Sequence, residues 1–155
     1  MSRKKLSSVL VGAGVLAAMI GLSAPASASE YRSFDLPLLT TGADGLGCAG
    51  DVWGIGQSYP QGDVPGQVSL QLKGWLKVFG VPAPWCELTP TVHWRNFTTG
   101  ESGAVPVRLG NWQPFFWVAP KVGNIDHLYT GAGDVEISIT TNYPHSPSVT
   151  RVTVY

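Results

Sequence analysis

Charge is scarce in this chain, and the residues that build catalytic and metal centres are few. Lys, Arg, Asp and Glu make up 13% of the 155 residues, and the chain has three histidines and two cysteines. No G-x-S-x-G motif is present, and the histidines lack paired ligand spacing. The sequence therefore indicates no catalytic residues, no metal site and no cofactor, and we expect a protein without enzymatic activity.

One enzymatic alternative stays open. Glycoside hydrolysis needs two carboxylates about 5 to 10 Å apart, and the sequence does not say which of its acidic residues lie close together. The candidates are Asp51, Asp63, Glu87, Glu101 and Asp134. Asp126 and His127 are neighbours in sequence, which does not place the carboxylate to orient the imidazole ring. A small secreted hydrolase acting on envelope polysaccharide is the first alternative function.

The N-terminal residues differ in composition from the rest of the chain. Basic residues at positions 3 to 5 precede an apolar run over residues 9–22, and small residues follow it. The apolar run is shorter than the roughly 20 residues that a helix needs to span a bilayer. We therefore expect a secretory signal peptide over residues 1–28, with cleavage after Ala28 or, alternatively, Ala26. Residues 29–155 then form a single exported domain.

The charge balance of the exported part bears on its partners. Without the basic residues at positions 3 to 5, the ten basic residues fall to seven, against ten acidic ones. A net negative charge disfavours nucleic acid or an anionic membrane as a partner. We expect a secreted protein, extracellular or associated with the cell envelope, with no integral membrane segment after cleavage. In style the sequence is similar to small secreted proteins of Gram-positive bacteria, a resemblance that carries over no functional residue.

The two cysteines, Cys48 and Cys86, both lie in the exported part. An even number of cysteines in an oxidising compartment favours a disulfide. Closing a loop of about 39 residues would stabilise the fold by about 4 kcal/mol in the chain-entropy model. We therefore predict a Cys48–Cys86 disulfide.

The fold class follows from a period of two, because no stretch keeps the helical period of 3.6. Apolar and polar residues alternate over residues 67–79, 86–96 and 134–141, and residues 148–155 are rich in β-branched side chains. The last two segments predict a terminal hairpin. The inward set is Val68, Leu70, Leu72, Leu76, Val78, Cys86, Leu88, Val92, Trp94, Val135, Ile137 and Ile139. We expect an all-β, immunoglobulin-like or related antiparallel β-sandwich of about seven or eight short strands, with a small barrel as the alternative.

Three local motifs lead to further predictions. Gly74 lies inside the clearest strand and predicts a bulge there. The region from Thr41 to Gly66 is rich in glycine and predicts long loops pinned by Cys48. The triplet beginning at Asn96 matches the glycosylation acceptor pattern, which has meaning only in a eukaryotic source.

The densest aromatic stretch is GNWQPFFWVAP, residues 110–120. Its first two residues, Gly110 and Asn111, favour a two-residue hairpin turn. That hairpin would pair the aromatic stretch with residues 104–109.

Pairing across this hairpin divides the aromatic residues between two faces, because opposite residues point to the same side of a sheet. Trp112 and Phe116 are assigned to the core, and Phe115 and Trp117 to the other face. Two alternatives stay open for the second face: it is exposed, or it is covered by a loop or by the second sheet.

An exposed aromatic face on a weakly charged, exported β domain suits the stacking of sugars or other ring-bearing ligands. We therefore expect a non-enzymatic binding or interaction module whose ligand is a cell-wall glycan or another extracellular protein. The predicted contact residues are Arg108, Gln113, Phe115, Trp117 and Trp75. The second alternative is a structural or oligomeric envelope protein in which the same face is a subunit interface.

Overall fold

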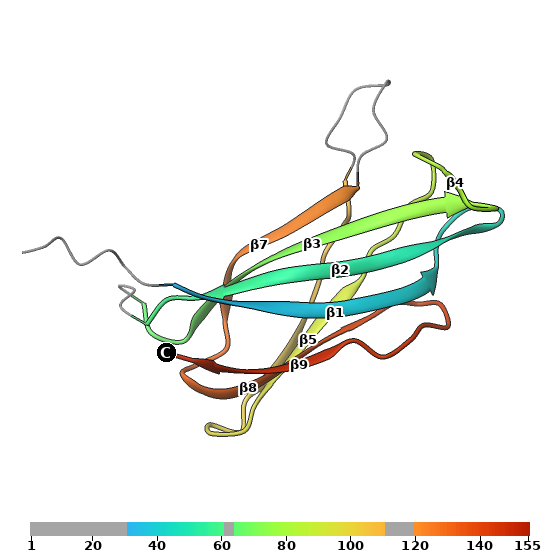
Figure 1. Cartoon of the computed structure of the whole chain (residues 1–155). Coiled ribbons are helices and arrows are strands. Elements are labelled where there is room, and N and C mark those ends of the chain that lie inside the picture. Colours follow the sequence, from blue (N-terminus) through green and yellow to red (C-terminus); the bar gives the residue numbers. More distant parts are fainter. Residues whose placement is uncertain (1–30, 61–63, 111–119) are drawn as a thin grey trace, which may run out of the picture.

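The computed structural model describes residues 31–60, 64–110 and 120–155, which contain nine strands and no helix (Figure 1). The strands are β1 (Arg32–Gly42), β2 (Cys48–Ser58), β3 (Gln67–Val78), β4 (Val81–Pro82), β5 (Thr91–Asn96), β6 (Ser102–Pro106), β7 (Lys121–Tyr129), β8 (Gly133–Thr140) and β9 (Val149–Val154). The all-β prediction is confirmed. The predicted signal peptide lies outside the described residues.

The strands form two antiparallel sheets. The first runs β1-β2-β3, and β3 pairs with β7 over its first part and with the short β4 at its end. The second runs β6-β5-β8-β9. Figure 1 shows the two sheets as layers, with β1, β2, β3 and β7 above and β5, β8 and β9 below. The arrangement is consistent with a β-sandwich.

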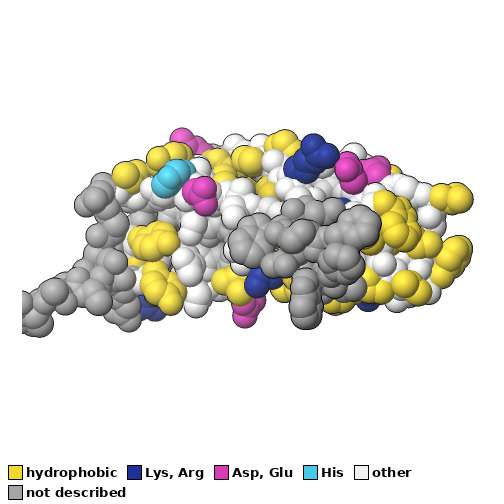
Figure 2. All heavy atoms as spheres, turned by 90° about the horizontal axis from the view of Figure 1, so that it is seen from above, with side chains coloured by type: hydrophobic (Ala, Val, Ile, Leu, Met, Phe, Trp, Pro, Cys, Tyr) yellow, Lys and Arg dark blue, Asp and Glu magenta, His cyan; other side chains and the backbone are white. Residues whose placement is uncertain are grey.

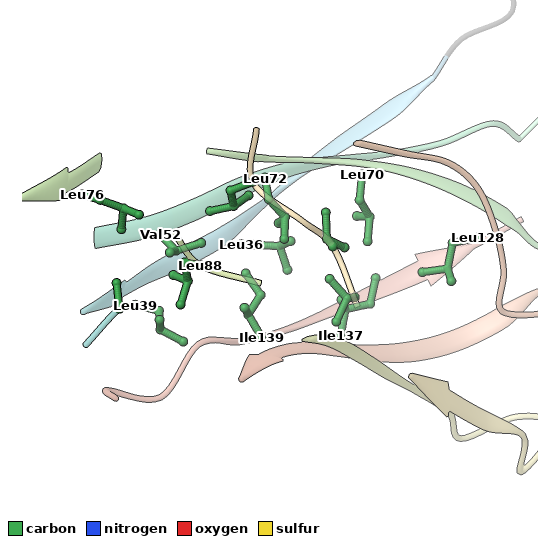
Figure 3. Packing of buried hydrophobic residues seen from close by; sticks show 14 of the residues in the cluster. Leu36, Leu39, Val52, Leu70, Leu72, Leu76, Leu88, Leu128, Ile137 and Ile139 are labelled. Carbon is green, nitrogen blue, oxygen red and sulfur yellow. The ribbon is translucent and has the colours of Figure 1, made fainter. Parts of the chain in front are cut away.

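The inward faces of both sheets contribute to one hydrophobic core. In β3 the buried residues are Val68, Leu70, Leu72 and Leu76, and in β8 they are Val135, Ile137 and Ile139. Figure 3 shows the leucines of the first sheet facing the two isoleucines of β8. These inward assignments are confirmed, because alternation of branched apolar residues is the pattern that one buried sheet face requires.

The predicted terminal hairpin is also confirmed: β8 and β9 pair antiparallel from Gly133 opposite Val154 to Ser138 opposite Val149. The link between these strands crosses to the first sheet. The hydroxyl of Ser148 donates to the carbonyl of Pro37 at 2.6 Å, within an irregular stretch of β1 where the register shifts. This bond satisfies a carbonyl close to the bulge and ties the C-terminal strand to β1.

The prediction of long loops from Thr41 to Gly66 is wrong, because residues 48–58 form the central strand β2. Its inward positions alternate with period two and are small, including Gly50, Gly54 and Gly56. A Cβ at Gly54 would lie 2.7 Å from Leu72 Cδ2, and one at Gly56 would lie 2.1 Å from the Phe34 ring. Glycine here marks close packing by large neighbours, not a turn.

The prediction of a bulge at Gly74 is wrong for the same reason. Gly74 pairs in unbroken register with Val52 on one side and with Lys121 on the other. A Cβ there would meet Leu109 Cδ1 at 2.5 Å. The glycine admits a leucine from the segment that follows β6, and the strand keeps its phase through Trp75.

The predicted two-residue turn at Gly110 and Asn111 is wrong as well. Gly110 exchanges both backbone hydrogen bonds with Val122, at 3.0 and 3.1 Å, so it belongs to a strand pair and not to a turn. The segment from Ala104 to Pro106 pairs with β5. The predicted partners across the turn, Trp112 to Trp117, lie outside the described residues.

The disulfide between Cys48 and Cys86 is confirmed, with Cα atoms 5.8 Å apart. It joins the start of β2 to the segment between β4 and β5. Asp44 and Glu87 exchange backbone hydrogen bonds of 2.8 and 3.2 Å beside it. The covalent bond and the backbone pair together fix this end of the sandwich.

Asn96 is fully buried and makes five hydrogen bonds through its side chain. Its amide nitrogen donates to the carbonyls of Thr130, Gly131 and Ala132, and its amide oxygen accepts from the backbone amides of Thr98 and Thr99. The side chain therefore joins the turn after β5 to the link between β7 and β8. A buried, fully bonded amide of this kind is not accessible to glycosylation in the folded chain.

Substituting Gly56→Ala should lower the free energy of unfolding by about 1 to 3 kcal/mol, because the new methyl group overlaps the Phe34 ring. Urea unfolding measures the change. Gln57→Ala, on the opposite face of the same strand, is the matched control. It removes only the acceptor of the Tyr59 hydroxyl and should change the free energy by less than about 1 kcal/mol. Equal stabilities of Gly56→Ala and the wild type would contradict the close packing described for β2.

Asn96→Ala should destabilise the protein by about 3 kcal/mol or more, since buried carbonyl and amide groups lose their partners. Thermal and urea unfolding check this value. Asn124→Ala, at an exposed position of β7, serves as the control. A loss below about 1 kcal/mol for Asn96→Ala would show that water replaces the amide at no cost.

Candidate functional site

The structure describes two of the five predicted contact residues. Trp75 lies on the outer face of β3, and Arg108 is exposed and bonded to the Glu87 carboxylate at 3.3 Å. Arg108 follows β6, in a segment whose neighbouring Leu109 packs against the inner side of β3 at Gly74. Trp75 and Arg108 therefore lie on different sides of β3. Gln113, Phe115 and Trp117 lie outside the described residues.

Trp75 belongs to a broad outer face built by β2 and β3. Because β3 keeps its phase, Lys73, Trp75 and Lys77 point to the same side. On β2, Asp51 pairs with Trp75, and Trp53 pairs with Lys73. Trp53 and Trp75 are thus diagonal neighbours across the two strands, at the spacing where aromatic side chains still reach one another. Both are partly exposed. We call this surface the outer face.

A shallow depression of about 310 Å³ lies further along the outer face. Residues of β2, β3 and β7 line it: Ile55, Gln57, Ser69, Leu70, Gln71, Asn124 and Asp126. Its rim offers amide, hydroxyl and carboxylate groups beside one exposed isoleucine, Ile55. The depression can therefore both donate and accept hydrogen bonds while covering an apolar surface.

Hydrogen bonds hold several side chains of the outer face in place. Asp51 accepts from the Thr40 hydroxyl at 3.0 Å and from Lys77 Nζ at 3.3 Å. In the depression, Gln71 Nε2 donates to Asn124 Oδ1 at 3.4 Å. These contacts join β1, β2, β3 and β7 across the sheet. They orient polar groups on the outer face before any ligand arrives, which reduces the ordering cost of binding.

The glycine pattern of β2 explains why its large side chains gather here. With Gly50, Val52, Gly54 and Gly56 turned inward, the alternate residues Asp51, Trp53 and Ile55 point outward. Sequence reasoning missed Trp53 because the glycines were interpreted as turn signals. The period-two spacing of small residues around Trp53 was the signal that identifies its face.

The candidate carboxylates for hydrolysis are mostly engaged in ion pairs or hydrogen bonds. Asp51 pairs with Lys77, Glu87 with Arg108, and Asp134 with Arg151. Within the described ranges, no three His, Cys, Asp or Glu residues lie close enough to hold a metal ion. Asp63 lies outside the described residues.

His127 contacts a residue other than its sequence neighbour Asp126. Its Nδ1 is hydrogen-bonded to the Gln67 side chain. Nδ1 of His127, the atom that a carboxylate would orient in a Ser-His-Asp triad, is therefore bonded to an amide side chain instead.

The outer side of the second sheet carries a cation–aromatic cluster. Arg95 and Arg151 lie over the Phe97 ring, with guanidinium carbons 5.0 and 4.4 Å from its centre. Arg151 donates to both carboxylate oxygens of Asp134, and these bonds lower the pKa of that carboxyl group. The charge of Arg151 is thereby partly neutralised within the sheet, and the Phe97 ring is already covered by the two guanidinium groups.

Lys121 is buried at the inner side of β7, where its Nζ donates to the carbonyl of Cys86. Burial lowers its pKa; the Glu87 carboxylate raises it and Arg108 lowers it further. The lysine bonds to the segment that contains the disulfide, which gives it a structural role beneath the sheet.

Compared with known proteins, the chain has no match among family models, curated proteins or solved structures. In the part of the chain that the structure describes, there is also no helix of the length and apolar character that crosses a membrane. The candidate site therefore rests on its own geometry.

The lowered pKa of Lys121 predicts a pH dependence of stability with a definite sign. The unfolded chain keeps this lysine protonated up to about its ordinary pKa of 10.5, whereas the folded chain releases the proton at lower pH. The lysine's contribution to the free energy of unfolding should therefore increase as pH rises through this interval. Urea unfolding of the wild type and of Lys121→Met, between neutral pH and pH 10.5, measures this contribution as the difference between the two proteins. A constant difference between the two proteins would contradict the lowered pKa.

Proposed function

We propose that the protein is a secreted, non-enzymatic β-sandwich module that binds an extracellular or cell-envelope glycan on its outer face. The supporting observation is the partly exposed pair of Trp53 and Trp75 on the same surface as the polar depression. The proposal differs from the sequence-based hypothesis in its contact residues, because Trp75 is joined by Trp53 and not by Arg108.

The chemistry of a sugar matches the two parts of this surface. A pyranose ring has an apolar face, which stacks on an indole, and a rim of hydroxyl groups, which donate and accept hydrogen bonds. Gln57, Gln71 and Asn124 offer amides for such a rim. A side-chain amide both donates and accepts hydrogen bonds, as a sugar hydroxyl does. The outer face therefore suits a neutral ligand that is rich in hydroxyl groups.

The length of the surface favours a chain of sugars over a single ring. Trp75 and Ser69 are six residues apart on β3, and each strand residue spans about 3.3 Å, so roughly 20 Å separate them. An oligosaccharide that follows the strand direction would contact the tryptophans at one end and the depression at the other.

The cellular setting is part of the proposal. The basic and apolar N-terminal sequence is typical of a signal peptide, and the disulfide is compatible with an oxidising compartment outside the cytoplasm. Within the sandwich class, we propose a relative of the immunoglobulin-like folds. The strand order of this protein differs from that of the immunoglobulin fold, since β1, β2 and β3 are consecutive neighbours in one sheet.

Trp53→Ala and Trp75→Ala should each weaken glycan binding about tenfold or more, because an aromatic contact residue commonly contributes over 1 kcal/mol to binding. Both side chains are partly exposed, so the variants should remain folded. Calorimetric titration with chitotetraose and cellotetraose, together with cosedimentation with insoluble peptidoglycan, measures the effect.

Phe97→Ala removes an aromatic ring from the second sheet and is the matched control, with unchanged binding expected. Wild-type protein that binds none of the three glycans, or tryptophan variants that bind as well as the wild type, would overturn the proposal.

A further inference from the structure

Four large apolar side chains are exposed together at one end of the sandwich. Leu46 is 98% exposed, Phe79 94%, Trp85 68% and Val81 66%. They come from the β1–β2 turn, the β3–β4 turn, strand β4 and the segment after β4. Figure 1 places these elements at the end opposite the start of β1, and Figure 2 shows hydrophobic side chains gathered there. We call these four residues the apolar end.

The apolar end is held together by bonds close to it. The Cys48–Cys86 disulfide connects the residues that follow Leu46 and Trp85. A Cβ at Gly47 would lie 3.5 Å from the Phe79 ring, which brings the two turns into contact. The exposed side chains are therefore presented on a fixed support and not on independent loops.

Phe79 has no explanation in turn chemistry or in packing. It is the first residue of the two-residue turn between Val78 and Val81, with φ of 48°, and Gly80 follows with φ of 84°. Such a turn favours Asn or Gly at its first position, because bulky residues at positive φ are strained. An exposed phenylalanine is thus unfavourable for both the turn and the solvent, and this combination points to a contact outside the chain.

The charge pattern identifies the kind of surface that fits. Residues 78–86 contain no charged side chain, and neither do residues 45–47. The flanking charged residues have partners. The Asp44 carboxylate accepts a hydrogen bond from the Tyr143 hydroxyl at 2.5 Å, Lys77 is paired with Asp51, and Glu87 with Arg108. These flanking groups already bond to one another, and the Trp85 indole N–H is the only side-chain donor among the four apolar residues and their turns. Few groups are therefore left to form the hydrogen bonds of a protein interface, which typically has about one per 100–200 Å².

We propose that the apolar end inserts into the interfacial region of a lipid bilayer with zwitterionic headgroups. Leu46, Phe79 and Val81 would enter the boundary of the acyl chains, and Trp85 would lie at the headgroup level, where its apolar ring and its polar N–H are both satisfied. Because the apolar end is uncharged, binding depends on buried apolar area and not on anionic lipid. This inference is independent of the outer face and of glycan binding.

The test is flotation of the purified protein with phosphatidylcholine vesicles, with or without 30% phosphatidylglycerol. Phe79→Asn and Trp85→Gln should each lower the partition coefficient by roughly tenfold, the loss expected for one large apolar side chain. Wild-type binding should change little with salt or with the anionic lipid. Lipids brominated on their acyl chains should quench tryptophan fluorescence in the wild type and quench it less in Trp85→Gln.

Phe79→Asn separates membrane binding from folding, because asparagine suits this turn better than phenylalanine does. The variant should have an equal or higher melting temperature while binding vesicles more weakly, which a purely structural role would not produce. Tyr129→Asn removes an exposed aromatic residue near the start of β3 and should bind vesicles as the wild type does.

Two results would overturn the proposal: wild-type protein that does not float with either vesicle, or unchanged flotation of Phe79→Asn and Trp85→Gln. A third would assign the apolar end to a second copy of the chain. In that case sedimentation would show a concentration-dependent dimer that Phe79→Asn abolishes, without flotation of the wild type.

Discussion

The inward glycines of β2 are the constraint on which the first sheet depends. Leu36 and Leu72 approach so closely at Gly54, and Phe34 at Gly56, that no side chain larger than hydrogen fits without displacement. The core is therefore filled from β1 and β3, across a central strand that contributes little bulk of its own. The same alternation turns the larger residues of β2 outward, so the packing requirement inside also determines the composition of the outer face.

Two further ties fix the parts of the sandwich that strand pairing alone does not hold. The disulfide and its adjacent backbone pair secure the end at Cys48 and Cys86. Asn96 secures the turn after β5 and the link before β8. A frame held at these places supports two surfaces of different chemistry: an aromatic and amide-rich sheet face, and an uncharged apolar end. A module with both surfaces would engage glycan and lipid without competition between them.

Strands with bulky apolar residues on one face could be predicted from the sequence, as β3 and β8 show. The disulfide followed from the cysteine count. β2 could not be recognised in the same way, because glycine serves both as a turn residue and as a space for a neighbour, and the neighbours Phe34 and Leu72 are distant in sequence. The turn at Gly110 failed because Val122 competes for that residue as a strand partner. Of the candidate site, Trp75 was predicted and Trp53 was missed, and the predictions for residues 112–117 lie outside the described residues.

The outer face, with Trp53 and Trp75, is the surface that we propose recognises glycan. A titration of ¹⁵N-labelled protein with chitotetraose and cellotetraose tests this directly. The indole and amide signals in proton–nitrogen spectra report which residues contact the sugar. Glycan binding on the outer face should produce saturable shifts of the Trp53 and Trp75 indoles and of the Gln71 and Asn124 side-chain amides, with the signals of Arg95 and Phe97 unmoved. Shifts confined to the second sheet, or no shifts with either sugar, would contradict it.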